Sequence, residues 1–171
     1  YDLQSPEIFP LPDQVDEISG ITFFNDSTLL AVDDEHGQLF KLMLQKNVEI
    51  SGFRFGEDKD YEGIARVDSD VYILQSKGNL YRFPYNDSIH KTDKIQLELK
   101  GKNQFEAFYY DGVHQKLVLI CKKCDDDTKV SSTAWAYDLS TSQFDQKAYF
   151  TIERAAIEKV FGEPIKRFKP S

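Results

Sequence analysis

Short runs of apolar residues alternate with polar turns along most of the chain, at lengths that are typical of β-strands. The runs fall into three groups of four, and each group begins near an acidic residue. The predicted strands span residues 18–24, 28–33, 38–44 and 48–55, then 62–67, 71–75, 79–83 and 94–99, then 105–110, 116–121, 133–138 and 147–152. Three glutamates, Glu17, Glu62 and Glu106, mark the starts of the groups at steps of 45 and 44 residues. The sequence therefore predicts a threefold repeat of four short strands.

A repeat of about 40–45 residues built from short strands is the sequence signature of a β-propeller blade. We predict an all-β fold of four-stranded blades, with repeats over residues 16–59, 60–103 and 104–152 in a single domain that spans 1–171. Three blades do not close a ring, and an open end leaves strand edges unpaired. We therefore expect the chain to be the N-terminal part of a larger propeller, or to complete a ring by self-association.

The spacing of the apolar residues changes after the third repeat. Residues 153–161 are mostly strong helix formers with apolar side chains at helical spacing, and Gly162 follows them. This pattern predicts a short helix. Beyond it, residues 166–171 resemble the approach to a fourth repeat.

The first repeat can be aligned with the second in two ways. Matching the glutamates places Glu17 opposite Glu62, whereas matching the Gly-Ile pairs at 20–21 and 63–64 places Ser19 opposite Glu62. We favour the second alignment, because a glycine inside a strand usually marks a close approach of two backbones. Residues two apart on a strand share a face, so both alignments send the acidic side chains to the same side.

The composition is that of a folded, acidic domain. Hydrophobic residues make up 40% and aromatic residues 13% of the 171 positions, which argues against disorder. The formal net charge of −8 disfavours nucleic-acid binding, because a phosphate backbone requires a basic protein surface. The acidity either serves solubility or contributes to a cation site.

Two observations bear on the location of the protein. No apolar run approaches the length of a membrane span, and no signal peptide is present, yet the chain begins at Tyr1 rather than Met. We therefore interpret the chain as a processed or trimmed form. A missing leader or lipid anchor would leave membrane attachment open.

Cys121 and Cys124 form a Cys-Lys-Lys-Cys motif at the end of a predicted strand. A zinc ribbon requires a second pair of cysteines, and a thioredoxin-like motif requires a βαβ unit, so both are disfavoured. We expect Cys121 to be a buried apolar side chain. A disulfide between the two cysteines and exposure of Cys124 as a reactive thiol are the alternatives.

The chain resembles the SdiA-regulated (YjiK-like) family in several short motifs along its length. They are Glu17-Ile18-Ser19-Gly20-Ile21, Asp60-Tyr61-Glu62-Gly63-Ile64, Phe105-Glu106-Ala107, Asp33-Asp34-Glu35 with Gly37, and Cys121-Lys122. The resemblance implies a five-bladed propeller, distantly similar to NHL-repeat proteins, with a calcium site and a place in the bacterial cell envelope, often behind a signal or lipoprotein leader. No activity is securely attached to this family. Ala107 departs from its motif, which has glycine there, and the chain ends at Ser171, where the family continues.

The acidic residues at the repeat starts are candidates for a calcium site. If their strands are the innermost of each blade, the carboxylates converge near a central channel, where like charges repel one another without a cation. Calcium binds about 6–8 oxygen ligands, typically carboxylates, carbonyls and waters. We predict Glu62 and Glu106 as the first ligands, and Glu17 and Asp60 as further ones. The alternative is that each glutamate caps backbone N–H groups where blades meet.

The other acidic clusters are better explained as turns. Asp125-Asp126-Asp127 is expected in a solvated turn rather than at a surface cation. Asp33-Asp34-Glu35 also has turn chemistry, with Asp34 as a further candidate for the channel. The segment that begins at Asp58 has Ser69 at the twelfth position, where a calmodulin-type loop requires glutamate.

The sequence gives little support to nucleophilic catalysis. It contains neither a Gly-x-Ser-x-Gly elbow nor a glycine-rich phosphate loop. His36, His90 and His114 lie in turn-like stretches, where we expect them to be exposed.

Three functions are compatible with these features. The first is a non-catalytic, calcium-binding propeller that acts as a binding or scaffold module for a protein or small molecule. The second is a metal-dependent hydrolase of the lactonase, esterase or phytase-like kind, in which one channel carboxylate is the general base on a bound water. The third is a protein-interaction propeller without a metal. We favour the first, because no histidine accompanies the glutamate repeats.

Overall fold

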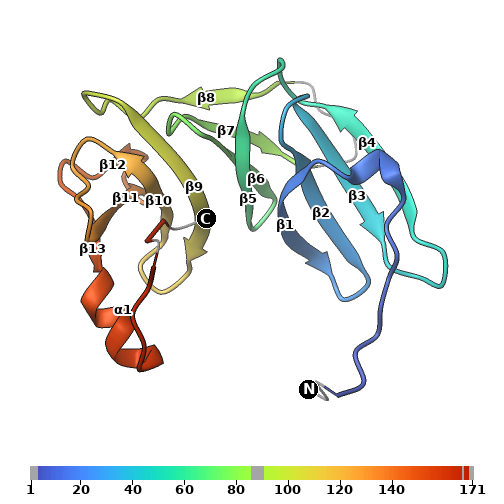
Figure 1. The fold of residues 1–171 in the computed structure, drawn as a ribbon. Coiled ribbons are helices and arrows are strands. Elements are labelled where there is room, and N and C mark those ends of the chain that lie inside the picture. Colours follow the sequence, from blue (N-terminus) through green and yellow to red (C-terminus); the bar gives the residue numbers. More distant parts are fainter. Residues whose placement is uncertain (1–3, 86–90, 167, 170–171) are drawn as a thin grey trace.

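The computed structural model describes residues 4–85, 91–166 and 168–169. It contains three antiparallel sheets that follow one another along the chain, together with one short α-helix (Figure 1). In each sheet the first four strands are ordered as they are in the sequence. The predictions of an all-β fold, three successive groups of strands and a short helix are confirmed, but the third sheet has five strands instead of the predicted four.

The first sheet agrees closely with its predicted strands. These are β1 (Ile18–Asn25), β2 (Thr28–Asp33), β3 (Gln38–Met43) and β4 (Glu49–Arg54). The Asp33 carboxylate closes the turn after β2, because it accepts hydrogen bonds from the backbone N–H groups of Glu35 and His36. A 3-10 turn, η1 (Asp13–Val15), places Val15 against the face of this sheet that points away from the second sheet.

The second sheet has a shorter fourth strand than the sequence predicts. Its strands are β5 (Tyr61–Val67), β6 (Asp70–Gln75), β7 (Leu80–Pro84) and β8 (Asp93–Ile95). After Ile95 the strand pairing ends, and Leu97 and Leu99 pack against the core between the second and third sheets. The predicted strand at 94–99 is therefore wrong in its second half, because its apolar alternation reflects contact with the next sheet.

The third sheet differs from the prediction at its outer edge. Its strands are β9 (Asn103–Asp111), β10 (Lys116–Cys124), β11 (Ser131–Asp138), β12 (Gln143–Phe144) and β13 (Phe150–Glu153). β12 and β13 pair with opposite ends of β11, so two short strands replace the single one predicted at 147–152. Asp127 closes the turn between β10 and β11, because its carboxylate accepts hydrogen bonds from Cys124 and Thr133.

The predicted helix at 153–161 is confirmed as α1 (Arg154–Phe161). Gly162 ends it in the left-handed conformation, with φ 74°, and its N–H donates to the carbonyl of Glu158 at 2.8 Å.

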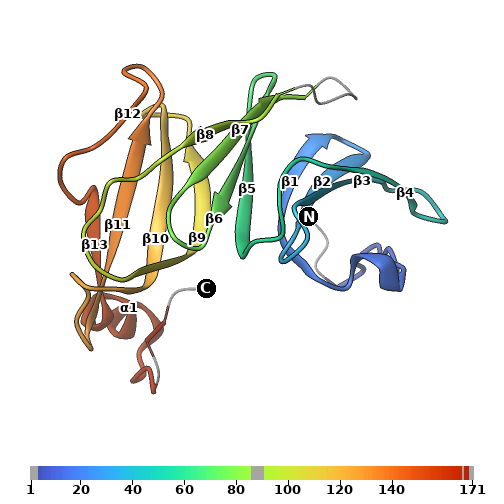
Figure 2. The ribbon, with the colours of Figure 1, turned by 90° about the horizontal axis from the view of Figure 1, so that it is seen from above.

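The three sheets stand next to one another with their first strands side by side (Figures 1 and 2). β5 lies between β1 and β9, and the later strands of each sheet lie farther out. One apolar core fills the space between the first and second sheets, and another fills the space between the second and third. Over the residues that the structure describes, the sheets form an open fan and not a closed ring.

Glycines allow the first strands to approach closely. A Cβ atom on Gly20 would lie 2.8 Å from the Cα of Gly63, and a Cβ on Gly63 would lie 2.9 Å from the Cβ of Phe108. Real Cβ atoms do not make contacts this short. The glycines of the two Gly-Ile pairs therefore occupy matching places at adjacent strands, which agrees with the alignment that we favoured.

Candidate cation site

A β-bulge recurs near the start of the first strand in every sheet. The pairing passes from Ile18–Asp33 to Gly20–Val32 in the first sheet, from Tyr61–Gln75 to Gly63–Leu74 in the second, and from Phe105–Cys121 to Ala107–Ile120 in the third. One residue on each first strand is left without a partner, and these are Ser19, Glu62 and Glu106. A bulge re-aims the side chain of its extra residue. Ser19, and not Glu17, is therefore the counterpart of Glu62.

Backbone hydrogen bonds join each sheet to the next at this same end. In the first two sheets, the backbone N–H of the residue after the second strand donates a hydrogen bond to the residue just before the first strand of the same sheet. The carbonyl of that same residue accepts a hydrogen bond from the first strand of the next sheet. The four bonds are Asp34 N to Glu17 O (2.8 Å), Tyr61 N to Asp34 O (2.8 Å), Ser76 N to Asp60 O (2.9 Å) and Phe105 N to Ser76 O (2.7 Å). Asp34 and Ser76 thus occupy equivalent positions, and Lys122 is the third member by its place after Cys121.

Three carboxylates from two sheets converge at this end. One oxygen atom of each of Asp34, Asp60 and Glu62 lies within 4.8 Å of the other two. Asp34 follows β2, whereas Asp60 and Glu62 flank the start of β5. Asp34 and Glu62 are half-buried and Asp60 is exposed. We refer to these three residues as the carboxylate cluster.

Burial and the crowding of negative charge both raise the pKa of Glu62. Burial raises the pKa of Glu62 to about 8, and the charges of Glu106 and Asp60 add to the rise. A hydrogen bond between the Glu62 and Asp60 side chains works in the same direction. Near neutral pH the cluster therefore retains a proton that an ordinary glutamate would have lost.

Asp34 is affected in the same way. Burial is the largest cause that raises its pKa, followed by the charges of Asp60, Glu35 and Glu17. Glu17 therefore acts on the cluster through its charge, although it is not one of the three converging carboxylates.

Glu106 has a different partner. Its side chain, which is 11% exposed, forms an ion pair with the ammonium group of Lys122 and accepts a hydrogen bond from Gln104 Nε2 at 3.2 Å. The hydrogen bond to Glu106 is the main cause that raises the pKa of Lys122, and the charges of Glu62 and Asp60 contribute. The protein thus supplies its own cation beside Glu106.

The predicted ligands are therefore only partly brought together. Asp60 and Glu62 lie in the carboxylate cluster, Glu106 lies beside Lys122, and Glu17 lies at the edge of the group. Asp34 was a secondary candidate and occupies a central position. From the sequence, Lys122 was named only within the Cys121-Lys122 motif and was given no role at the site, although Lys122 follows the bulge-side pair Cys121–Phe105 as Asp34 follows the pair Asp33–Ile18.

The donor set fits a hard divalent cation. Three carboxylates supply up to six oxygen atoms, and calcium binds about 6–8 oxygens in flexible geometry. Burial and the repulsion between neighbouring carboxylates raise the pKa values of Glu62 and Asp34, and a bound cation would offset the repulsion. Asp34, Asp60 and Glu62 are the residues that would hold it.

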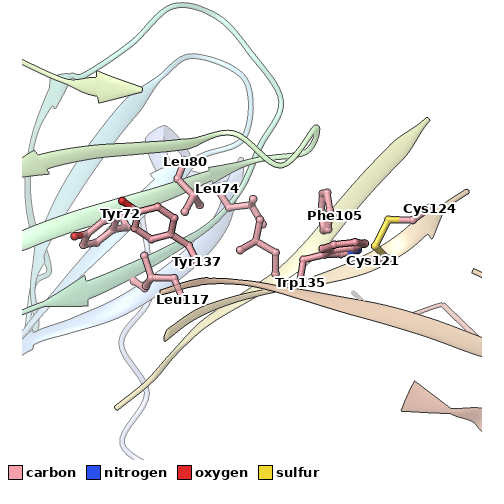
Figure 3. Close-up of a cluster of buried hydrophobic side chains, with 11 residues drawn as sticks. Tyr72, Leu74, Leu80, Phe105, Leu117, Cys121, Cys124, Trp135 and Tyr137 are labelled. Atoms are coloured by element: carbon pink, nitrogen blue, oxygen red, sulfur yellow. A yellow bond between two sulfur atoms is a disulfide. The ribbon is translucent and has the colours of Figure 1, made fainter. Parts of the chain in front are cut away.

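The two cysteines form a disulfide. Cys121 is fully buried and Cys124 is 6% exposed, so the predicted burial of Cys121 is confirmed and an exposed reactive thiol at Cys124 is wrong. Phe105 and Trp135 lie next to the disulfide in the core between the second and third sheets (Figure 3). Asp127 also lies within reach of the two sulfurs, but both sulfurs are bonded to each other and are not free to ligate a metal.

Neither His36 nor His114 belongs to the carboxylate cluster. His36 and His114 are exposed, as predicted, and each contacts an aspartate three residues earlier in its own turn, Asp33 and Asp111. His90 lies outside the described residues.

Comparisons with known proteins show similarity in fold. No protein-family model matches the chain, and no curated protein matches it. A luciferin-regenerating enzyme matches with a TM-score of 0.54 and 11% identity, over 75% of this chain and 44% of the enzyme. The extracellular domain of a B. thetaiotaomicron protein named as a hybrid two-component system matches with a TM-score of 0.54 and 18% identity, over 85% of this chain and 18% of that one. A second structure of that domain, named as a one-component system, matches with a TM-score of 0.53 and 17% identity, over the same shares of the two chains.

The chain spans less than half the length of each of these solved structures. Among the described residues, no helix has the length and apolar character needed to cross a membrane.

Proposed function

We propose that the chain forms part of a β-propeller of the bacterial cell envelope, related to the SdiA-regulated (YjiK-like) family, which binds calcium and acts as a binding or scaffold module. The convergence of Asp34, Asp60 and Glu62 from two neighbouring sheets is the observation that carries this proposal. The function is assigned from this site, because a fold of this kind hosts many functions.

The repeated sheets support the propeller. Each is an antiparallel unit of similar length, and the bulge and the sheet-to-sheet hydrogen bonds recur at equivalent positions. The first strands are adjacent, as the innermost strands of successive blades would be. Further blades would continue the same arrangement around a central axis.

The disulfide supports a location outside the cytoplasm. Disulfides persist in oxidising compartments such as the bacterial periplasm and the cell surface, and they are rare in the cytosol. Two of the similar structures are extracellular domains by name. We therefore propose the periplasm or the cell surface as its location, where a lipid anchor would attach it to the membrane.

A metal-dependent hydrolase is the second candidate. Glu62 favours it, because a glutamate whose pKa is raised to about 8 beside a cation site is suited to exchange a proton with a bound water. Calcium-dependent hydrolysis of a lactone or phosphate ester that Glu62→Gln abolishes would support this candidate, and retention of such hydrolysis would oppose it.

Thermal unfolding tests calcium binding. A ligand that binds only the folded state at about one hundred times its Kd stabilises it by about 2.7 kcal/mol, or about 5–10 °C for a domain of this size. We expect calcium to raise the midpoint relative to EDTA in the native protein and in Glu49→Gln, an exposed control on β4. Glu62→Gln should lose most of the rise. An equal midpoint with calcium and with EDTA in the native protein would favour the metal-free interaction module instead.

A further inference from the structure

Lys122 owes its position to an irregularity at the end of β10. The pairing of β10 with β9 passes from Cys121–Phe105 to Lys123–Gln104, so Lys122 is an extra residue on its strand. Cys124 then pairs with Asn103. The disulfide joins Cys121 to Cys124, with Cα atoms 5.7 Å apart, and therefore encloses the bulge in a short covalent loop.

The loop is anchored in the core. Both cysteines belong to the cluster of buried side chains between the second and third sheets, together with Phe105 and Trp135 (Figure 3). With its two ends fixed in this way, the Cys121–Cys124 loop has little freedom to move relative to β9. Glu106 lies on β9 next to Phe105, and it faces the ammonium group of Lys122.

The neighbouring Lys123 has no comparable role. It lies in the same covalent loop, but its side chain is exposed and it pairs by its backbone with Gln104. The disulfide loop therefore directs one lysine to the carboxylates and the other to solvent.

We propose that the Cys121–Cys124 disulfide positions Lys122 as a resident cation beside Glu106, and that reduction of the disulfide releases Lys122 and raises the affinity of the carboxylate cluster for a divalent cation. The second half of this inference depends on the proposed calcium function. Lys122 acts here as a positioning residue that keeps Glu106 away from the cation and makes the cation site sensitive to redox state.

The chemistry needs only a dithiol as reductant. A dithiol transfers two electrons and two protons to the two sulfurs, the Cys121–Cys124 bond breaks, and the reductant becomes a disulfide. Cys124, which is 6% exposed, lines an open pocket of about 710 Å³ together with Lys122 and Lys123, and a reductant would have to approach the buried bond from this pocket.

Electrostatics predicts that release of Lys122 raises the affinity of the carboxylate cluster for a divalent cation. With Lys122 in place, one positive charge already offsets Glu106 and acts on Glu62 and Asp60. When Lys122 moves away, its positive charge no longer competes with the divalent ion for these carboxylates. Glu106 is then free to coordinate the ion. Loss of one unit charge close to a divalent ion in a partly exposed site changes affinity by about tenfold.

Calorimetric titration with calcium alone tests the consequence. We expect reduction of the native protein with dithiothreitol to raise the calcium affinity by about tenfold. Oxidised Lys122→Met should show the same increase without reduction, and reduction should then change its affinity no further. Oxidised Lys123→Met removes an equal charge from the adjacent residue and should bind calcium like the native protein.

A second measurement does not require calcium. Chemical unfolding of the native protein, Lys122→Met, Glu106→Gln and the double variant in EDTA gives the coupling between the two side chains. We expect a coupling of about fivefold in the unfolding equilibrium constant of the oxidised proteins. The coupling should fall to near one after reduction, with circular dichroism confirming that the reduced protein is folded.

The two measurements separate the inference from the proposed function. Equal coupling in oxidised and reduced protein, or a reduced protein that has lost its fold, would overturn the inference even if calcium binds. Equal calcium affinity in all oxidised and reduced samples would overturn the redox sensitivity while leaving calcium binding intact. If no sample binds calcium, the proposed function fails, and loss of coupling upon reduction still supports the positioning role.

Discussion

At the scale of single residues, the site depends on an imbalance of charge. Asp34 and Lys122 occupy equivalent positions in their repeats but carry opposite charges. The first adds to the carboxylate cluster and the second offsets Glu106. In the proposed function Asp34, Asp60 and Glu62 would therefore hold the cation, whereas Glu106 is paired with Lys122.

Glu62 makes the stability of the cation-free protein dependent on pH. Because its pKa in the folded protein is raised to about 8, the folded state holds a proton that the unfolded state releases near pH 4.5. This contribution is complete below pH 4.5 and is lost as the pH rises through 8. In EDTA we therefore expect the free energy of unfolding to fall between pH 5 and pH 9.

Glu62→Gln should remove most of that decline. At pH 8 the variant should be about 1–2 kcal/mol more stable than the native protein in EDTA, a figure that allows for screening of the half-buried carboxyl by water. Urea unfolding across the pH series measures the difference, with Glu49→Gln as the exposed control. If the free energy of unfolding of the native protein changed between pH 5 and pH 9 in the same way as that of Glu62→Gln, the raised pKa of Glu62 would be contradicted.

At the scale of strands and turns, much of the fold could be predicted because apolar alternation is a local signal. The strands of the first sheet follow that alternation closely. The edges could not be predicted in the same way, since Leu97 and Leu99 owe their apolar character to contact with the third sheet. The pairing of Lys122 with Glu106 was missed because it depends on a bulge and on the position of a second strand.

The approach of β1 to β5 gives a prediction at this scale. Gly20→Ala places a Cβ 2.8 Å from the Cα of Gly63, where only backbone movement relieves the clash. We expect a loss of about 2–3 kcal/mol in the free energy of unfolding. Gly112→Ala is the matched control, because its Cβ would meet nothing closer than 3.5 Å, and it should change stability by less than about 0.5 kcal/mol. Equal effects of the two substitutions, measured by urea unfolding, would argue against close packing of the first strands.

The turn between β10 and β11 gives another prediction. Asp127 accepts hydrogen bonds from Cys124 N (2.8 Å), Thr133 N (2.8 Å) and Thr133 Oγ1 (2.9 Å). Asp127→Ala leaves these donors without their acceptor and should cost about 1–3 kcal/mol in the free energy of unfolding. Asp126→Ala changes an exposed neighbour in the same turn and should have little effect. Similar losses in both variants would show that the turn does not depend on the Asp127 carboxylate.

At the scale of the whole molecule, three sheets with adjacent first strands bring acidic residues from separate repeats to one place. No single repeat contains the cluster, because Asp34 belongs to the first sheet while Asp60 and Glu62 belong to the second. A cation held there would tie the two sheets together at their inner edge. The convergence of these carboxylates is thus a consequence of the packing of the first two sheets.

A crystal structure determined with calcium, with the ion located by its anomalous scattering, tests this account most directly. We predict an ion bound by carboxylate oxygens of Asp34, Asp60 and Glu62 at about 2.3–2.6 Å, with Glu106 still paired to Lys122 in the oxidised protein. Calcium bound elsewhere, or no ordered calcium at these carboxylates, would contradict the central claim.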